Sequence, residues 1–513
     1  MVAASQPYAT LAGLDVLRDG GNAIDAAVAA AAVLHVVEPH NAGIGGDVFA
    51  LFWWERTGEL KGLNGSGRAP MGATIENLRR RGHCQMPFEH IDAITTPGAL
   101  DGWITLLEGY GRMDPSRLLA PAIRLAEEGF VVSPIVHREW TLEVEKLSRD
   151  PDSDRHYLLA GRAPRAGEVF RNRALGRTLR TVAKGGRDVF YRGELGEKVV
   201  QAIREKGGLL TMGDLETHRS DWVEPIRTTF QDHEVFELPP NGQGITALIA
   251  LNVLEDFDLP LLGHNSADYC HSVLEAIKLA FADRNRYVTD PEVEDVPTER
   301  LLSKEYAAER RRLMNPQYAL PDASPGRLAA GDTVYLATAD AEGNMVSFIN
   351  SLYSRFGSGV CAGETGLILQ NRGAGFVLDE RRPNRLQPHK RPLHTIIPAF
   401  LKKDGKPLMA FGVMGGDMQP QGHVQFLLNH LVFGMNIQQA VEAPRFRFVV
   451  GNEVWLEDRM PAAIGQDLTR RGHCVSRKDG SSFGGAQAIA KNPETGVYSG
   501  ASESRKDGCA LGY

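Results

Sequence analysis

The sequence predicts a large α+β protein in which helices dominate the first two thirds of the chain and short β-strands the last third. Helical patterns separated by short loops fill residues 97–320. From residue 333 onward, short β-favouring runs take over. A chain of 513 residues exceeds the usual size of a single core, so the alternatives are two or three domains or one large layered body.

Two helices are expected near the N-terminus, over residues 10–18 and 22–37. Asp19-Gly20-Gly21 separates them, and a glycine commonly follows the last residue of a helix. Asn22 suits the N-cap of the second helix, and Asp25 places a negative charge in its first turn. Because the second helix is rich in alanine, we expect it to be buried against closely packed neighbours.

Further elements are expected where apolar residues recur at a regular spacing. The predicted helices cover residues 118–128, 175–184, 194–206, 244–255, 267–286, 423–432 and 437–443. Strands are predicted at 48–54, after a glycine-rich turn, and at 235–238, before the turn Pro239-Pro240-Asn241. The glycine-rich turn leads into a strand and not into a helix, which argues against a nucleotide-binding loop.

The most informative stretch is a predicted hairpin that begins at Thr333. A β-favouring run over 333–339 ends in turn-forming residues at 340–344, and a second run follows at 345–349. The preceding segment, 315–332, holds few large apolar residues and is expected at the surface. A threonine at the start of a buried strand can become a nucleophile with its own α-amine as base, once the chain is cut before it.

Composition excludes several classes of function. A net charge of -7 leaves no basic footprint for nucleic acid. Five widely spaced cysteines, without a Cys-x-x-Cys pair, argue against disulfides and zinc, so no metal or cofactor is expected. The two His-Cys pairs, at 83–84 and 473–474, follow Arg-Arg-Gly strings that are typical of helix C-termini. No apolar run reaches the ~20 residues that span a bilayer, and no signal peptide is visible, which predicts a cytoplasmic protein without a membrane partner.

An ordered set of short motifs resembles the gamma-glutamyltransferase family of N-terminal-nucleophile hydrolases, across essentially the whole chain. The motifs are Gly20-Gly21-Asn22-Ala23-Ile24-Asp25-Ala26-Ala27, the stretch Glu38-Pro39 to Gly46, Pro239-Pro240, Gly343-Asn344, Phe356-Gly357-Ser358-Gly359, Lys390-Arg391-Pro392-Leu393, Gly415-Gly416, Ala443-Pro444-Arg445 and Gly500-Ala501-Ser502. Each motif alone is weak evidence, but their order is specific.

The resemblance implies a fold and a maturation step. The fold is a four-layer αββα sandwich, made as one precursor that cuts itself before a threonine. Counting back from Gly343-Asn344 places the cut between Asp332 and Thr333. The predicted products are a helix-rich large subunit, 1–332, and a β-rich small subunit, 333–513, which remain partners in one intertwined domain.

The resemblance also implies catalytic roles. Thr333 attacks the carbonyl of Asp332 in the precursor, and its freed α-amine, with an unperturbed pKa of about 7.7–8.0, then serves as the base. The mature enzyme forms an acyl-enzyme with a small-molecule amide and passes the acyl group to water or to an acceptor amine. Gly415 and Gly416 are implied as the oxyanion hole, and Ser351 as the hydroxyl that hydrogen-bonds the nucleophile.

Positions that bind substrate in typical family members differ in this chain. Ser66 stands where those members carry an arginine, and Arg68 is displaced from it by two residues. Gly375 stands at an acidic position. A Ser-Ser pair is replaced by His394-Thr395, and Tyr353 replaces an asparagine near the nucleophile.

The lost acidic residue changes the expected substrate, because a buried ammonium without a carboxylate is costly. The string Asn371-Arg372-Gly373-Ala374-Gly375-Phe376 resembles the branch with oxamate amidohydrolase and cephalosporin-acylase-like members. We expect an oxamate-like or glutaryl-like acyl group that carries a carboxylate and no α-amine. The residues expected to bind it are Arg68, Tyr353, Arg372, His394 and Thr395. The alternatives are a true gamma-glutamyltransferase or glutathione hydrolase and, in another class, a catalytically silent scaffold.

Overall fold

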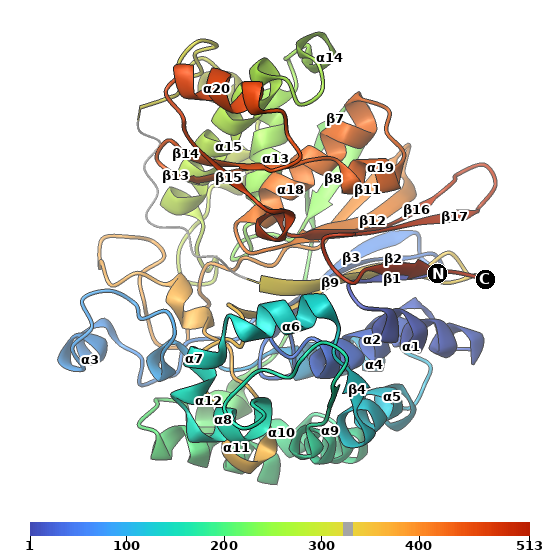
Figure 1. Ribbon diagram of the computed structural model, residues 1–513, viewed down its shortest axis with the longest axis vertical. Helices are drawn as coiled ribbons and strands as arrows, with labels where there is room; N and C mark the ends of the chain where they lie inside the picture. The colour runs from blue at the N-terminus through green and yellow to red at the C-terminus, as the bar shows by residue number, and fades with distance from the viewer. Residues whose placement is uncertain (322–331) are drawn as a thin grey trace.

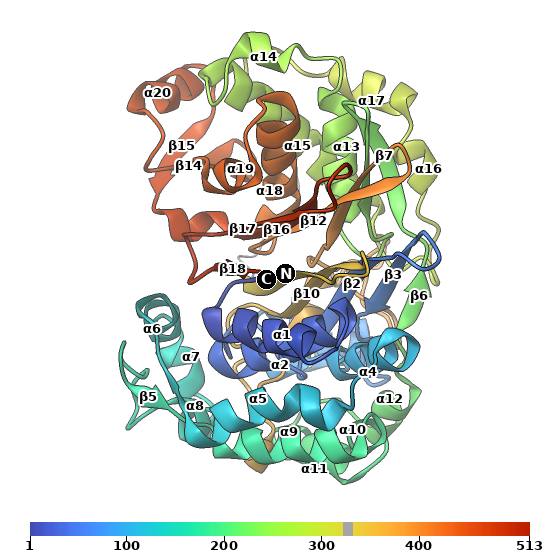
Figure 2. The same ribbon diagram turned by 90° about the vertical axis from the view of Figure 1, so that its right-hand side faces the viewer.

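The computed structural model describes residues 1–321 and 332–513. Two β-sheets lie face to face at the centre of the molecule, and helices cover the outer face of each sheet (Figures 1 and 2). The predicted four-layer αββα sandwich is therefore confirmed.

The first sheet has seven strands, and every neighbouring pair in it is antiparallel. Their spatial order is β18 (Cys509–Leu511), β1 (Val2–Ala4), β9 (Asp332–Ala339), β10 (Met345–Tyr353), β2 (Asp47–Trp54), β3 (Glu59–Gly65) and β6 (Asp221–Val223). Because β1 pairs with β18, the two ends of the chain lie side by side (Figure 2).

The second sheet has six strands and is also antiparallel throughout. Their order is β17 (Tyr498–Ser502), β16 (Gly485–Lys491), β12 (Lys406–Met414), β11 (Ala399–Lys403), β8 (His233–Glu237) and β7 (Ile226–Phe230). Residues before and after Thr333 contribute strands to both sheets. The division into two subunits at this residue stays a prediction.

Helices form the two outer layers (Figure 2). Next to the first sheet lie α1 (Pro7–Arg18), α2 (Ala23–Val37) and α4 (Ala99–Tyr110), and beyond these helices lie α5 (Pro115–Glu128), α9 (Arg173–Gly185) and α11 (Glu194–Glu205). The layer on the second sheet contains α13 (Gly244–Leu254), α15 (Ala267–Tyr287) and α18 (Met418–Leu427). Every residue of α2 is buried, as its alanines predict, and Asn22 and Asp25 form a capping box at its start.

Shorter elements complete the chain. The helices are α3 (Ile75–Arg80), α6 (Pro134–Thr141), α7 (Val144–Ser148), α8 (Pro151–Tyr157), α10 (Asp188–Tyr191), α12 (Met212–Thr217), α14 (Leu259–Leu262), α16 (Thr298–Leu301), α17 (Lys304–Arg311), α19 (Ile437–Glu442) and α20 (Ala462–Arg470). The strands are β4 (Phe130–Val131), β5 (Val169–Phe170), β13 (Phe446–Val450), β14 (Glu453–Glu457) and β15 (Cys474–Lys478).

Apolar side chains fill the three interfaces between the four layers. One cluster lies between the first sheet and its helices and includes Val28, Ala50 and Leu336. Another lies between the second sheet and its helices, and a third, with Phe49 and Phe400, lies between the two sheets. Because side chains of a strand alternate between its faces, each central strand supplies two of these cores.

The predicted hairpin is confirmed. Strands β9 and β10 pair along their length, and the carboxylate of Asp340 accepts hydrogen bonds from the backbone N–H groups of Glu342 and Asn344 in the turn. The helix expected at 423–432 begins earlier, at Met418, and ends in a π-helical turn, Leu428–Val432. Of the surface segment predicted at 315–332, residues 322–331 lie outside the described part of the chain.

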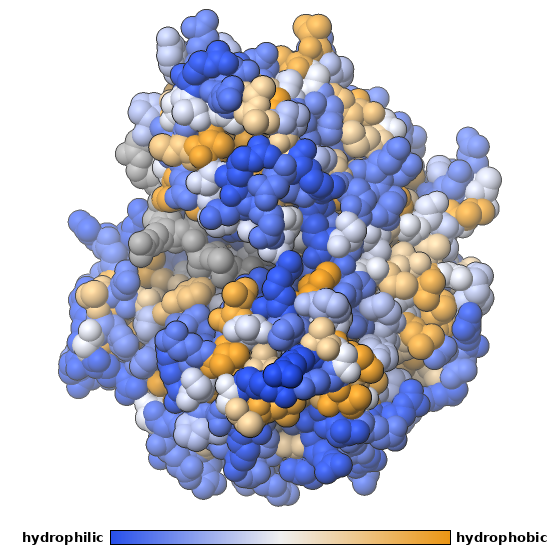
Figure 3. All heavy atoms as spheres, in the orientation of Figure 1, coloured by the Kyte–Doolittle hydropathy of each residue, from blue (hydrophilic) through white to orange (hydrophobic). Residues whose placement is uncertain are grey.

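The outer surface of the face in Figure 3 is largely hydrophilic, with apolar side chains dispersed in small groups. Within residues 1–321 and 332–513, no helix combines the length and the apolar character needed to cross a membrane.

Candidate active site

Thr333 is a fully buried residue at the second position of β9. Its hydroxyl donates to Oγ of Ser351 at 3.2 Å, and its Oγ1 accepts from Nε2 of Gln419 at 3.3 Å. The pairing of β9 with β10 shifts register between Asn350 and Tyr353, opposite the start of β9. Such a bulge reorients side chains, and here it brings the Ser351 hydroxyl to the threonine.

Ser351 is held in place by its own strand and by the glycine-rich turn before β2. Its Oγ accepts from the backbone N–H of Tyr353 at 2.8 Å. A β-carbon at Gly46 would lie 2.2 Å from the Ser351 carbonyl oxygen, so only glycine permits this approach. The glycine-rich turn thus supports the strand beside Thr333.

Gly415 and Gly416 form the turn between β12 and α18, and both adopt positive φ, +118° and +59°. Their carbonyls accept from the N–H groups of Met418 and Gln419 in the first turn of α18. Within the described residues, neither glycine N–H donates to a protein acceptor. Two adjacent N–H groups without protein acceptors are what an oxyanion hole requires.

The glycine turn is supported from behind by residues that sequence reasoning missed. The Gln243 side chain donates to the carbonyls of Gly416, at 3.1 Å, and Thr395, at 2.7 Å. The buried guanidinium of Arg284 donates in turn to Oε1 of Gln243 and to Asp417. The signal for Gln243 was its place in the loop that follows Pro239-Pro240, a motif of the resemblance.

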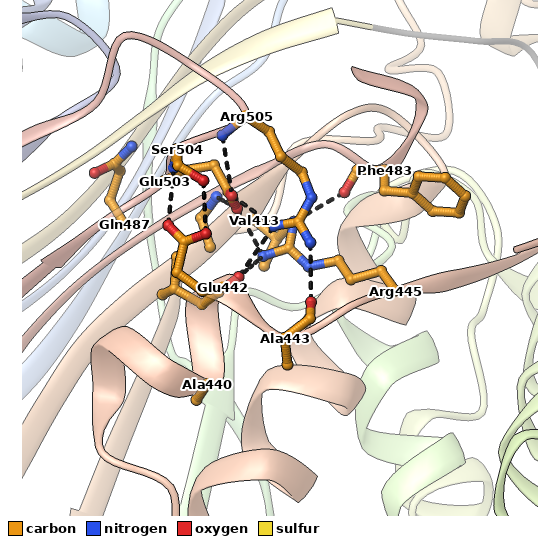
Figure 4. A network of polar contacts seen from close by, with 12 residues as sticks. Val413, Ala440, Glu442, Ala443, Arg445, Phe483, Gln487, Glu503, Ser504 and Arg505 are labelled. Carbon is orange, nitrogen blue, oxygen red and sulfur yellow. Dashed lines mark hydrogen bonds and ion pairs between the residues drawn. The ribbon is translucent and has the colours of Figure 1, made fainter. Parts of the chain in front are cut away.

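A buried ion network, shown in Figure 4, lies next to the segment that packs against the other side of the same turn. A β-carbon at Gly415 would lie 3.0 Å from Cα of Gly484. Arg445 donates to the neighbouring Phe483 carbonyl and to Glu503, whose carboxylate also accepts from Arg505. The motif Ala443-Pro444-Arg445 and the C-terminal segment therefore meet behind the glycine turn.

Arg372 is the most unusual charged residue of the site. Its side chain is fully buried, its Nη1 donates to Oγ1 of Thr395 at 2.6 Å, and its guanidinium lies 4.4 Å above the ring of Tyr353. Its Nε and Nη2 atoms have no hydrogen-bond partner in the described part of the chain. Burial lowers the pKa of Arg372 to about 10, so the group stays charged at neutral pH.

Asp47 and His394 form a buried pair beside this arginine. Burial lowers the pKa of His394 to about 4, and the ring is therefore neutral and donates Nε2–H to Asp47 at 2.9 Å. Burial works against ionisation of Asp47, but the hydrogen bond from His394 and the charge of Arg372 lower its pKa. Nδ1 of His394 accepts from the N–H of Ile396. Both ring nitrogens of His394 are thus used within the protein.

Arg68 lies in a separate group of charges. It is mostly buried, and its guanidinium lies 2.9 Å from Glu292, 3.6 Å from Asp290 and 3.8 Å from Asp221. Arg391 pairs with Asp221 in the same group. The structure does not join Arg68 to the contacts around Thr333.

Six of the other predicted residues are joined with Gln243 and Gln419 in one closed circuit of contacts. Thr333 contacts Ser351, Ser351 contacts the backbone of Tyr353, and the ring of Tyr353 lies under Arg372. Arg372 donates to Thr395, and Gln243 links Thr395 to Gly416. Gln419 closes the circuit between Gly416 and Thr333. We refer to these eight residues as the site circuit.

Two groups of metal-ligating side chains occur elsewhere in the described residues. One contains His83, His90 and Asp92, and the other His271, Glu275 and His473. In the first group Arg81 pairs with Asp92, and in the second Lys278 pairs with Glu275 at 2.7 Å. A cation would have to compete with a resident positive charge in both groups, which disfavours a metal.

Comparison with known proteins identifies the family. The family description for gamma-glutamyltranspeptidase matches residues 9–513. The chain belongs to the gamma-glutamyltranspeptidase family. The predicted resemblance is confirmed, and membership of this family makes the chain an enzyme of amide-bond hydrolysis or transfer.

Relatives within the gamma-glutamyltranspeptidase family match over the full length. The chain is 39% identical to the glutathione hydrolase-like proenzyme YwrD of Bacillus subtilis, over 100% of this chain and 98% of that protein. It is 35% identical to the oxamate amidohydrolase proenzyme of Klebsiella pneumoniae, over the same shares of the two chains. Its structure is similar to that of cephalosporin acylase from Bacillus halodurans, with a TM-score of 0.94 and 44% identity, over 100% of this chain and 96% of that one.

Proposed function

We propose that this protein is a self-processing amidohydrolase or acyltransferase whose nucleophile is Thr333 and whose acyl substrate carries a carboxylate that binds Arg372. The observation that carries the substrate class is a fully buried guanidinium with two unpartnered nitrogens in the site circuit. Oxamate-like and glutaryl-like amides both have this chemistry.

Processing and turnover use the same oxygen. In the precursor, Oγ1 of Thr333 attacks the carbonyl carbon of Asp332, the C–N bond breaks, and the hydroxyl proton passes to the freed amine. Water then hydrolyses the ester, which leaves a carboxylate on Asp332 and a free hydroxyl on Thr333, and the two subunits remain associated. In turnover the α-amine of Thr333 takes the hydroxyl proton and gives it to the leaving amine, and water or an acceptor amine removes the acyl group.

The unpartnered donors of Arg372 favour an anionic ligand. A buried donor without an acceptor costs about 1–3 kcal/mol, and more when the donor is charged. A carboxylate accepts two parallel N–H bonds from a guanidinium, which a neutral amide cannot do as strongly. A substrate carboxylate would therefore satisfy the arginine while its acyl carbon lies at Thr333. Tyr353 and Thr395 would fix the orientation of the guanidinium, and His394 would act through Asp47.

The same region offers little to a substrate ammonium. A β-carbon at Gly375 would lie 2.8 Å from the Leu393 carbonyl oxygen, so the acidic side chain of typical family members does not fit without a backbone shift. Asp47 accepts from the N–H groups of Gly67 and Gly98, besides two side chains, and Asp417 pairs with Arg284. Both carboxylates are committed to protein donors.

The relatives support the reaction class, and their names suggest two types of acyl substrate, one with a carboxylate only and one with a γ-glutamyl group. The Klebsiella and Bacillus halodurans proteins are named for oxamate and for a cephalosporin, and the Bacillus subtilis protein for glutathione. Proenzyme relatives support cleavage into a large and a small subunit. The alternative function is therefore hydrolysis of a γ-glutamyl amide.

The first test combines a denaturing gel with a substrate panel. The wild type is expected to give bands for 332 and 181 residues, since 513 minus 332 is 181, and Thr333→Ala a single uncut band. The processed enzyme is then assayed with oxamate, a glutaryl anilide and a γ-glutamyl anilide. A persistent uncut wild type would support the silent scaffold. Efficient turnover of the γ-glutamyl compound alone would refute the carboxylate substrate class.

A further inference from the structure

Gln419 is a fully buried side chain, in the first turn of α18, and the protein uses both ends of its amide. Its Oε1 accepts from the backbone N–H of Ile397 at 3.0 Å, and its Nε2 donates to Oγ1 of Thr333 at 3.3 Å. A backbone N–H only donates, so the contact with Ile397 fixes which end of the amide is oxygen. The NH₂ group must face Thr333.

The position of Gln419 couples it to the glycine turn. Its backbone N–H donates to the Gly416 carbonyl at 3.1 Å, so the backbone that shapes the turn also carries the side chain that reaches the threonine. Ile397 lies two residues after Thr395, which accepts from Arg372. Gln419 is therefore oriented both by the glycine turn and by the chain segment that carries Thr395.

We propose that Gln419 is a positioning residue that orients the nucleophile, an inference that rests on the proposed role of Thr333. By donating to Oγ1, the amide occupies one lone pair of the oxygen and leaves the hydroxyl proton to point to another acceptor. The same N–H stabilises negative charge that develops on Oγ1 as its proton leaves. Gln419 forms no covalent bond and exchanges no proton in either reaction.

The length of this hydrogen bond fits the role. At 3.3 Å the contact is longer than the usual N–H···O distance of about 2.9–3.0 Å. Hydrogen bonds to an anionic oxygen are shorter and roughly twice as strong as those between neutral groups. The hydrogen bond is therefore stronger when Oγ1 carries developing negative charge than when it is a resting hydroxyl. An interaction accelerates a step only if it is stronger in the transition state than in the ground state.

Two other buried glutamines of α18 provide the contrast. Gln421 exchanges hydrogen bonds with the backbone of Phe448, and Gln425 does so with the backbone of Phe446. These contacts attach the helix to β13. Gln421→Met thus removes a comparable buried amide two residues away from Gln419 without touching Thr333.

The experiment measures precursor cleavage after a pulse of cell-free synthesis, in Gln419→Met, Gln419→Glu and the control Gln421→Met. Loss of a hydrogen bond to a charged oxygen predicts cleavage about 10- to 100-fold slower in Gln419→Met. The control is expected within about twofold of wild type, because the Gln421 side chain contacts the backbone of Phe448 and Asp417 and reaches neither Thr333 nor the glycine N–H groups. After processing, Gln419→Met should lower kcat by a similar factor and leave KM unchanged, since the contact strengthens only during reaction.

Gln419→Glu keeps the acceptor for Ile397 and the size of the side chain, so it tests the proposal even where the methionine variant loses stability. An ionised carboxylate repels the developing oxyanion, and a protonated one donates to it. Its cleavage rate relative to wild type should therefore rise as the pH falls from about 8 to about 5, which a purely structural role does not predict.

Two results would overturn the proposal, and they differ from failure of the proposed function. If Gln419→Met cleaves and turns over like Gln421→Met, the positioning role is wrong although Thr333 remains the nucleophile. A flat pH dependence of Gln419→Glu relative to wild type would have the same meaning. If Thr333→Ala is still cut, the proposed function itself is wrong.

Discussion

The two halves of the site circuit differ in what holds them. On the nucleophile half, Thr333, Ser351 and the Gly415-Gly416 turn are set by backbone geometry, namely a bulge, two positive φ angles and closely approaching strands. On the arginine half, Arg372 is set by side chains: the Thr395 hydroxyl, the Tyr353 ring and the Asp47–His394 pair.

This difference has a consequence for how such a site diversifies. Backbone geometry tolerates few substitutions, so we expect the nucleophile half to vary little among family members that act on different substrates. A substitution can change a side-chain charge without moving the strands, so we expect the preference for the acyl group of the substrate to change more easily. The following predictions test whether the two halves separate in this way.

The largest effect is expected from Gly415→Ala. A side chain at φ +118° is strained, and its β-carbon would lie 3.0 Å from Cα of Gly484. The turn must shift and misalign its N–H groups, and losing one oxyanion donor costs roughly 10²–10³ in rate. We expect a loss of this size in kcat for every substrate, together with slower precursor cleavage.

The matched control lies at the other end of β12. Gly405 has φ +76° and open space around its α-carbon, so Gly405→Ala carries a similar backbone penalty away from the site. It should lower the melting temperature and leave kcat unchanged. Equal losses of kcat in the two variants would mean that the turn acts through stability alone.

The next effect is expected from Arg372→Met, and it should depend on the substrate. Loss of charge-assisted hydrogen bonds predicts a roughly 10- to 100-fold rise in KM for a carboxylate-bearing amide. Turnover of a carboxamide analogue of the same length should change little, because its binding does not use the charge. Arg372→Lys keeps the positive charge and loses the planar pair of donors, so its KM for the carboxylate-bearing amide should lie between those of the wild type and Arg372→Met. Equal effects on both substrates would remove the arginine from recognition.

Much of the nucleophile half could be predicted from the sequence, because it depends on short motifs in a fixed order. Thr333, Ser351 and Gly416 lie in the site circuit, and Gly415 directly precedes Gly416 in the same turn. Gln419 was missed because its partners, Ile397 and Thr333, lie 22 and 86 residues away in the sequence, and no motif of the resemblance includes the glutamine.

The arginine half was harder to predict, because it depends on contacts between distant side chains. Arg68 was expected to bind substrate from its nearness to a family position, but three carboxylates near it form a separate group of charges. His394 was expected in the same role, and its ring nitrogens instead contact Asp47 and Ile396. Sequence distance does not show which counter-charges a buried side chain will meet.

The smallest effect concerns how the arginine half responds to pH. Burial lowers the pKa of His394 from its ordinary 6.5 to about 4. Between these values the unfolded chain binds a proton that the folded chain does not, so the free energy of unfolding decreases as the pH falls through this window. From pH 7 to about pH 5.5 the histidine accounts for about 1 kcal/mol of this loss. Urea unfolding at both pH values should show a smaller loss in His394→Asn than in wild type, by about this amount. An unchanged loss would mean that burial of the neutral His394 ring does not contribute to the pH dependence of the free energy of unfolding.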